Sequence, residues 1–167
     1  MIEFSEKCDL EPACNKLSKL VFKDLIELDE LQNMLDVSYA ATGMPSGIID
    51  AINGEVYAGA GWQRICVQFH RANPDSNLNC IASDTAIVSK IKDTPYCGYK
   101  CANGLWDVGV PIKCMGKHIA TLFLGQFFYD EEIPDKDYFI KQAKRFGYDT
   151  EDYLSALDEV PRFKKSV

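Results

Sequence analysis

The sequence predicts an α+β fold: a sheet of about five antiparallel strands with helices packed on one side, preceded by an N-terminal helix. Apolar residues recur at helical spacing from Asn15 to Thr42. An Asn53-Gly54 pair stands between two short apolar segments, and a long apolar run fills Ile119–Phe128. Along the chain the patterns follow the order helix, hairpin, two helices, three strands and two helices, which such a sheet explains best.

Length and charge limit the possible functions. The 167 residues suffice for one domain with a substantial core. The net charge of −7 argues against binding of nucleic acid or of an anionic membrane. No stretch approaches the ~20 apolar residues of a membrane-spanning helix, and residues 1–19 lack the apolar region of a signal peptide. We therefore expect a cytoplasmic domain that contacts neither membrane nor nucleic acid.

The N-terminal segment shows the longest helical pattern. Its apolar residues, spaced mainly by three, four and seven, are Leu17, Leu20, Val21, Leu28, Leu31 and Leu35. Gly43 and Pro45 end the helix. This apolar stripe either packs on its own domain or joins two copies of the chain, and we expect a homodimer through the helix. The predicted boundaries are a helical extension over 1–27, the main domain over 28–161 and a tail over 162–167.

The segment that follows predicts a hairpin and two helices. Asn53-Gly54 is a strong hairpin signal because both residues tolerate positive φ. Residues 62–72 and 74–92 have helical patterns, and Asp75 or Ser76 is expected to cap the second helix. The predicted inner face of that helix consists of Ile81, Thr85 and Val88.

The central strands carry the most informative pattern. Residues 95–100 predict one strand, and Cys101–Phe128 predicts two longer strands joined at Met115-Gly116-Lys117. Gln126 stands out within the second strand, because a buried amide costs free energy unless it is hydrogen-bonded to protein, water or a ligand. It is therefore a candidate for ligand recognition. An acidic loop over 130–135 and helices over 134–146 and 150–158 complete the predicted elements.

Seven cysteines are many for a chain of this length. In a reducing compartment they are thiols, metal ligands or redox sensors before they are disulfides. Cys66, His70, Cys80 and Cys101 could together form a zinc or iron site or a redox switch. Because the sequence has no Cys-x-x-Cys pair, we expect no cofactor and keep the metal as the alternative. Two histidines without a local nucleophile signature also argue against an enzyme.

Aromatic and polar residues gather near the same strands. The aromatic residues are Tyr96, Tyr99, Trp106, Phe123, Phe127 and Phe128, and the polar ones are Cys101, Asn103 and Gln126. Small ligands are usually held in apolar cavities that contain a few well-placed donors and acceptors. Phe123 and Phe127 fit a plain core, whereas Trp106 and Gln126 favour a ligand pocket.

Several motifs, taken in order along the chain, resemble those of the PocR ligand-sensing domain. They are Leu31-Gln32, Ala40 with Thr42-Gly43, Ile48–Asp50 with Gly54, Cys66–His70, Cys80 with Ser83-Asp84, Cys101–Trp106, Pro111-Ile112 and Gly125-Gln126, over roughly Leu28–Pro161. The resemblance implies a PAS-like variant fold. It also implies a sensory role in bacterial transcription regulators, histidine kinases and other signalling proteins, with ligands such as propanediols and other small hydrocarbon derivatives.

These patterns and the resemblance predict a sensor of small molecules. A diol, an alcohol or a short acid would enter between the sheet and residues 62–92, and would bias the output domain of a signalling protein. The resemblance implies a pocket shaped by Cys66, Cys80, Cys101, Asn103, Gly104, Trp106 and Gln126. The expected ligand-binding residues are these seven together with His70 and Tyr99. The rival hypothesis is the metal or redox switch.

Overall fold

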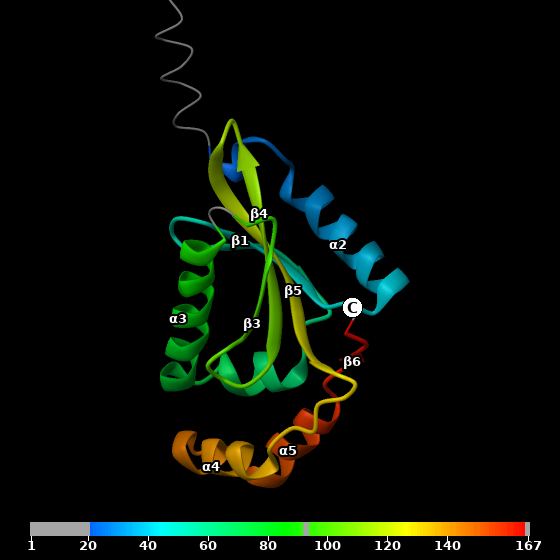
Figure 1. The fold of residues 1–167 in the computed structure, drawn as a ribbon, viewed down its shortest axis with the longest axis vertical. Helices are drawn as coiled ribbons and strands as arrows, with labels where there is room; N and C mark the ends of the chain where they lie inside the picture. Colours follow the sequence, from blue (N-terminus) through cyan, green and yellow to red (C-terminus); the bar gives the residue numbers. More distant parts are fainter. Residues whose placement is uncertain (1–20, 92–93, 166–167) are drawn as a thin grey trace, which may run out of the picture.

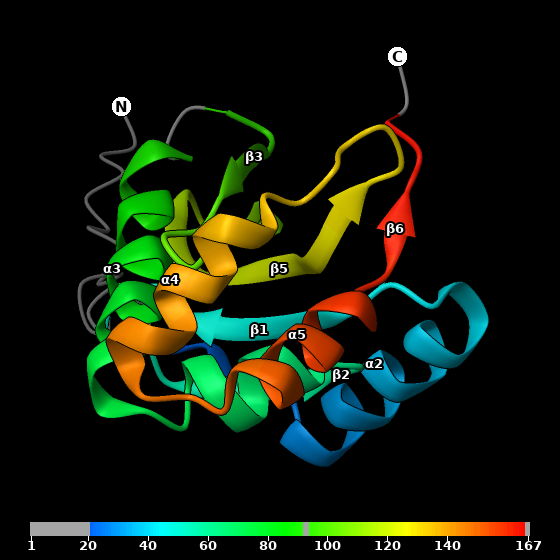
Figure 2. The same ribbon diagram turned by 90° about the horizontal axis from the view of Figure 1, so that it is seen from below.

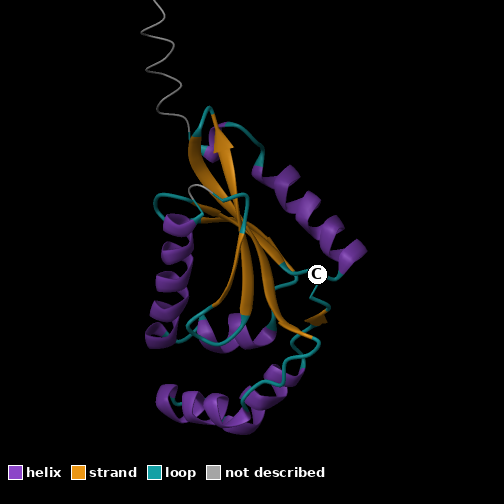
Figure 3. Ribbon diagram, viewed as in Figure 1, coloured by secondary structure: helices purple, strands orange, loops and turns teal. Residues whose placement is uncertain are grey.

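An antiparallel sheet runs through the domain, with helices against both of its faces (Figure 1 and Figure 3). The computed structural model describes residues 21–91 and 94–165. The order of antiparallel neighbours is β2 (Val56–Ala60), β1 (Ser46–Asp50), β5 (Lys117–Tyr129), β4 (Trp106–Cys114) and β3 (Cys97–Lys100). A short β6 (Arg162–Phe163) pairs in parallel with the end of β5. The predicted α+β class with a PAS-like antiparallel sheet is confirmed.

Both predicted hairpins are present. In the turn between β4 and β5, Met115 and Gly116 have φ angles of 49° and 78°, which suits a two-residue turn between twisted strands. The β1–β2 connection is longer than the predicted Asn53-Gly54 turn, and only the glycine there has positive φ. Asp50 organises this loop, because its Oδ1 accepts hydrogen bonds from the backbone N–H groups two and three residues later, at 2.7 and 2.8 Å.

Helix α2 (Leu28–Thr42) covers one face of the sheet. Figure 2 shows it beside β1 and β2, on the opposite side from α3. Leu31 and Leu35 are buried in the same cluster as Ile48 of β1. Gln32 fixes the helix to the edge strand β2, because its amide donates to the carbonyl of Gly59 at 2.9 Å and accepts from the N–H of the same residue at 3.2 Å.

The sequence predicted a helix from Asn15, but among the described residues the α-helix begins only at Leu28. Residues 15–20 lie outside the described residues, and a 3-10 turn, η1 (Phe22–Asp24), precedes α2. Phe22 is buried, and its ring stacks on Tyr57 of β2 with the centroids 5.3 Å apart. This contact with the sheet interrupts the helical path, which periodicity alone does not reveal.

The opposite face carries the π-helix η2 (Ile65–His70) and α3 (Pro74–Lys90). Both helices were predicted, but the cap of α3 is Asn73 rather than Asp75 or Ser76. The Oδ1 of Asn73 accepts hydrogen bonds from the backbone N–H groups of these two residues at 3.0 and 3.2 Å.

The inner face of α3 also differs from the prediction. Its buried residues are Ser76, Cys80 and Ile87, whereas the predicted face was Ile81, Thr85 and Val88. Ile81 is 52% exposed. Cys80, Ser83 and Asp84 of α3 line a cavity on this side. A search for large apolar residues therefore misses this part of the inner face.

Two C-terminal helices close one end of the sheet (Figure 2). Helices α4 (Lys136–Phe146) and α5 (Thr150–Asp158) form in the predicted segments and are capped by Asp135 and Asp149. They pack with η2 in a cluster that contains the fully buried Tyr153. Within the described residues, no helix is long and apolar enough to cross a membrane.

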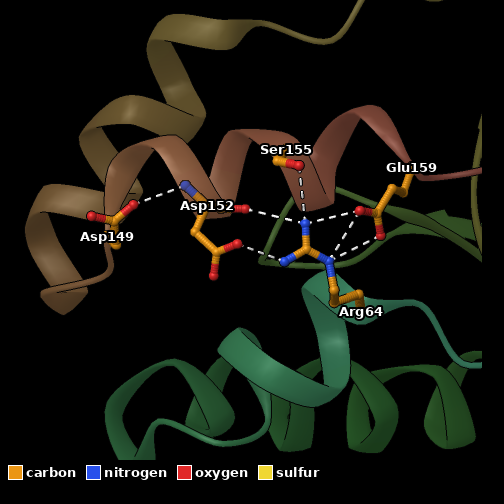
Figure 4. A network of polar contacts seen from close by, with 5 residues as sticks. All are labelled: Arg64, Asp149, Asp152, Ser155 and Glu159. Atoms are coloured by element: carbon orange, nitrogen blue, oxygen red, sulfur yellow. Dashed lines mark hydrogen bonds and ion pairs between the residues drawn. The ribbon is translucent and has the colours of Figure 1, made fainter.

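Arg64 ties α5 to the start of η2 (Figure 4). Its Nη1 binds Asp152 at 2.7 Å, and its Nη2 binds Glu159 at 2.9 Å and Ser155 at 3.1 Å. Asp149 in turn accepts a hydrogen bond from the N–H of Asp152 at 2.8 Å. One side chain thus spans the outer surface of α5 and holds it over the π-helix.

Two glycines provide a matched test of the packing between α2 and β2. Gly61 has φ of 67°, and a Cβ there would lie 2.2 Å from the ring of Tyr39; Gly54 has φ of 74° and open space around it. Gly54→Ala should lower the free energy of unfolding by about 1 kcal/mol, the cost of left-handed backbone. Gly61→Ala should lower it by about 2–4 kcal/mol, because the ring must also move. Urea unfolding measures both, and equal losses would contradict the contact.

Candidate functional site

A small cavity lies between the sheet and the two helices η2 and α3. Its volume is about 40 Å³, which corresponds to roughly three water molecules, or a ligand of about three to five non-hydrogen atoms. Strands β1, β4 and β5, both helices and the loop before β4 supply its lining. The lining residues are Gly47, Ile49, Trp62, Cys66, His70, Arg71, Cys80, Ser83, Asp84, Cys101, Asp107, Phe123, Gly125 and Gln126.

Trp62 provides the large aromatic surface of the cavity. Its indole ring lies across Gly47 and Gly59, where added Cβ atoms would approach it to 3.0 and 2.8 Å. Its Nε1 donates a hydrogen bond to the carbonyl of Ser46 at 2.8 Å. Glycines inside strands often mark such a close approach, so β1 and β2 leave room for the ring.

An ion pair stands at one side of the cavity. Arg71 Nη2 binds Asp84 Oδ2 at 3.1 Å, and the guanidinium lies 5.0 Å from the centre of the Trp62 ring. Burial raises the pKa of Asp84, and the charge of Arg71 opposes this effect. A larger hollow of about 390 Å³ adjoins the cavity, and the two share Ile49, Arg71, Asp84 and Phe123 as lining. The ion pair therefore stands between the inner cavity and the outer hollow.

Asp107 places a second carboxyl group in the same cavity. It pairs with Gly125 across β4 and β5, and a Cβ on that glycine would lie 2.2 Å from the Asp107 Oδ1. No hydrogen bond to this carboxyl is found within the described residues. Burial, reinforced by the nearby charge of Asp84, raises the pKa of Asp107 to about 7. The cavity thus holds two carboxyl groups and one guanidinium.

Gln126 presents a free amide nitrogen. Its Oε1 accepts a hydrogen bond from the backbone N–H of Gln63 at 2.8 Å, which fixes the orientation of the amide. Its Nε2 has no hydrogen-bond partner among the residues that the structure describes, although the side chain is only 7% exposed. The nitrogen keeps some solvent access, so water or a polar occupant of the cavity can accept its hydrogen bond.

Three thiols, those of Cys66, Cys80 and Cys101, also face the cavity. Burial raises the pKa of each thiol, that of Cys101 to about 12. They are therefore neutral at neutral pH, and a neutral thiol is a poor nucleophile. In the described part of the chain, no three His, Cys, Asp or Glu side chains are placed to hold a metal ion. The geometry gives the zinc or iron alternative no support.

Behind the cavity, the fully buried Asn103 connects three segments. Its Nδ2 donates to the backbone carbonyl of Ser76 at 3.1 Å and to Cys80 Sγ at 3.2 Å. Its Oδ1 accepts from Asn79 Nδ2 at 3.0 Å and from Gln142 Nε2 at 2.9 Å. A backbone carbonyl can only accept, so the amide of Asn103 has a single possible orientation.

This orientation determines the protonation of His70. With Gln142 Nε2 facing Asn103, its Oε1 faces Tyr153 and accepts from the phenol at 3.1 Å. The phenol has donated its proton, so His70 Nε2 must donate to it across 2.7 Å. Burial lowers the pKa of His70 to about 4, and the ring is neutral. Its Nδ1 is then an acceptor, 3.9 Å from Cys66 Sγ.

Five of the nine residues predicted to bind ligand line this cavity: Cys66, His70, Cys80, Cys101 and Gln126. Asn103 lies behind it. The other three lie elsewhere, and a role for them in ligand binding stays a prediction. Trp106 packs on Tyr129 and donates its indole proton to Glu132, and Gly104, with φ of 97°, lies against α4. The hydroxyl of Tyr99 is buried near Asp84 but makes no hydrogen bond of normal geometry with the described residues.

Among the cavity residues that sequence reasoning did not assign to the site, four carry an indole ring or a charged group. They are Trp62, Arg71, Asp84 and Asp107. For Trp62 the available signal was the pair of strand glycines beneath it. For Asp107 it was a charged residue within an apolar strand pattern. The pairing of Arg71 with Asp84 joins two helices and left no local signal in the sequence.

The series of hydrogen bonds from Asn103 through Gln142 and Tyr153 to His70, called the hydrogen-bond chain here, predicts a single tautomer of His70. Long-range ¹H–¹⁵N spectra of labelled protein should show a proton on Nε2 at neutral pH and no titration of this ring above about pH 5. The sequence contains one other histidine, His118, and its signals in the same spectra serve as the comparison for those of His70. A proton on Nδ1, or titration near the ordinary histidine pKa of about 6.5, would contradict the chain.

Asp107 predicts a specific pH dependence of stability. Its pKa is higher in the folded state than in the unfolded chain, so the folded state binds more protons between about pH 4 and pH 7, and wild-type stability falls as pH rises through this window. Asp107→Asn removes this loss. The stability of the variant relative to wild type should therefore rise by ~1.4 kcal/mol per pH unit over that window.

Urea unfolding between about pH 4.5 and pH 6.5 measures this difference. Groups that do not interact with Asp107 cancel in the comparison, whereas Asp84 is electrostatically coupled to Asp107 and contributes a smaller change of its own. The exposed Glu131→Gln is the control with the same change of charge, and it should run parallel to wild type. A constant difference for Asp107→Asn would show that the folded carboxyl titrates normally.

Comparison with known proteins places the chain in a family. A family model described as the sensory domain found in PocR matches residues 24–167, nearly the whole chain. A search of curated proteins finds no match. The matched range contains the cavity and the hydrogen-bond chain behind it, and the resemblance inferred from the motifs is confirmed. The chain therefore belongs to the PocR sensory-domain family.

Proposed function

We propose that this domain senses a small polar molecule held in the cavity between the sheet, η2 and α3. Membership of a sensory-domain family supports a ligand-sensing role. Gln126 carries the more specific proposal, because this residue lines the cavity and its Nε2 has no hydrogen-bond partner among the described residues. A ligand oxygen at this position would satisfy the donor.

The chemistry of the lining favours a ligand that both donates and accepts hydrogen bonds. A hydroxyl group can accept from Gln126 and donate to Asp107, while its carbon chain contacts Trp62. A diol or an alcohol fits this description. A short acid fits less well, because two carboxyl groups and one guanidinium leave the cavity with an excess of negative charge.

The hydrogen-bond chain offers a path for the signal. His70 and Cys66 touch the cavity, and Tyr153 and Gln142 carry the chain into α5 and α4. A ligand that binds one arrangement of His70 more tightly would bias these helices, and couplings of about 1–3 kcal/mol are typical. We propose that an output domain for signalling or transcription in the cytoplasm reads this bias. A homodimer through α2 is part of the proposal.

Calorimetric titration tests the sensor proposal directly. The panel is propane-1,2-diol, ethane-1,2-diol, propan-1-ol and lactate, added to the wild-type protein. At least one neutral member should bind, and Gln126→Ala should weaken it roughly tenfold, the effect of one lost hydrogen bond to a buried donor. Trp106→Phe is the control outside the cavity lining and should keep the affinity within about twofold.

Two results would contradict the proposal in different ways. If no member of the panel binds folded wild-type protein, the cavity is not a site for diols, simple alcohols or short hydroxy acids. If Trp106→Phe weakens binding and Gln126→Ala does not, the ligand lies at another place in the domain.

A further inference from the structure

We propose that the cavity selects a short amino alcohol, with its ammonium group at Asp107 and its hydroxyl group at Gln126. This inference rests on the proposed sensor function and names the class of ligand. No hydrogen bond to the Asp107 carboxyl is found among the described residues, and the residue lines the cavity. A donor on a ligand can therefore take the place of water at this carboxyl.

The positive charge already present is engaged elsewhere. Arg71 binds Asp84 at 3.1 Å and lies over the Trp62 ring at 5.0 Å. Arg71 also attracts the Asp107 carboxylate and lowers its pKa, but its hydrogen bond goes to Asp84, so two carboxyl groups share one guanidinium. A cationic ligand restores neutrality, which a hydroxyl group cannot do.

The Gln126 amide requires a hydrogen-bond acceptor from the ligand, whereas the Asp107 carboxylate requires a donor. Gln126 offers a donor, since its Oε1 is occupied by the N–H of Gln63 at 2.8 Å. An ammonium group has only donors, whereas a hydroxyl oxygen accepts. A ligand that satisfies both points therefore carries an ammonium group at one end and a hydroxyl group at the other.

Size sets the separation of the two groups. The cavity of about 40 Å³ has room for about three to five non-hydrogen atoms. A two- or three-carbon amino alcohol meets this limit, and its methylene groups and cation can lie against Trp62. Larger amines would have to displace the Arg71–Asp84 pair at the edge of the cavity.

Three probes of nearly equal size separate the possible ligand classes. They are 2-aminoethanol, ethane-1,2-diol and glycolate, which differ in charge: positive, neutral and negative. Titration at about pH 8 keeps the amine protonated and lies above the pKa of about 7 for Asp107. We expect 2-aminoethanol to bind roughly tenfold tighter than ethane-1,2-diol, and glycolate to bind weakest.

Asp107→Asn keeps the shape of the side chain and removes its charge. In this variant the preference for the amine over the diol should fall to about twofold or less, and Glu131→Gln should leave the wild-type preference intact. Thermal melts establish that each variant is folded. Retention of the full preference in folded Asp107→Asn would overturn the assignment of the ammonium group to Asp107.

The remaining outcomes distinguish this inference from the proposed function. If ethane-1,2-diol binds folded wild-type protein as tightly as 2-aminoethanol, the amino alcohol is overturned and the sensor proposal stands. If neither these probes nor the neutral panel bind, both proposals fail.

Discussion

The hydrogen bond from Asn103 Nδ2 to the carbonyl of Ser76 is the contact on which the polar interior depends. A backbone carbonyl cannot change from acceptor to donor, so this bond orients the amide of Asn103. Gln142, Tyr153 and His70 each take their orientation from the group before them. The orientation of the His70 ring in the cavity wall is therefore fixed before a ligand binds, which lowers the entropy cost of ordering this side chain on binding.

The same chain links the cavity to helices that contribute nothing to its lining. Gln142 of α4 and Tyr153 of α5 are buried, and a break in the chain would leave their polar groups unpaired at a cost of ~1–3 kcal/mol each. Movement of His70 must therefore be accommodated in α4 and α5. Arg64 adds a second connection to α5 on the outer surface (Figure 4). The π-helix lies between these two connections, and such helices are frequent at functional sites.

Sequence patterns predicted the strands and most helices because burial on a sheet imposes a strong periodicity. They also singled out Gln126, since one amide in a long apolar strand is a visible exception. They assigned Trp106 to the pocket and did not single out Trp62, although either ring can cover apolar surface. That choice depends on Gly47 and Gly59, which lie on different strands and leave space for only one of the rings. The Arg71–Asp84 pair depends on how two helices meet, which no local pattern records.

A β-bulge between Trp106 and Asp107 explains why Asp107, and not Trp106, is part of the cavity lining. Strict alternation along β4 is interrupted there, and bulges commonly redirect side chains next to functional sites. Trp106 turns to Tyr129 and Glu132, while Asp107 enters the cavity beside Gly125. A side chain at position 125 would occupy the space of the carboxyl group. The bulge and the glycine therefore act together, and between them they keep an unpaired acid inside a pocket that would be more stable without it.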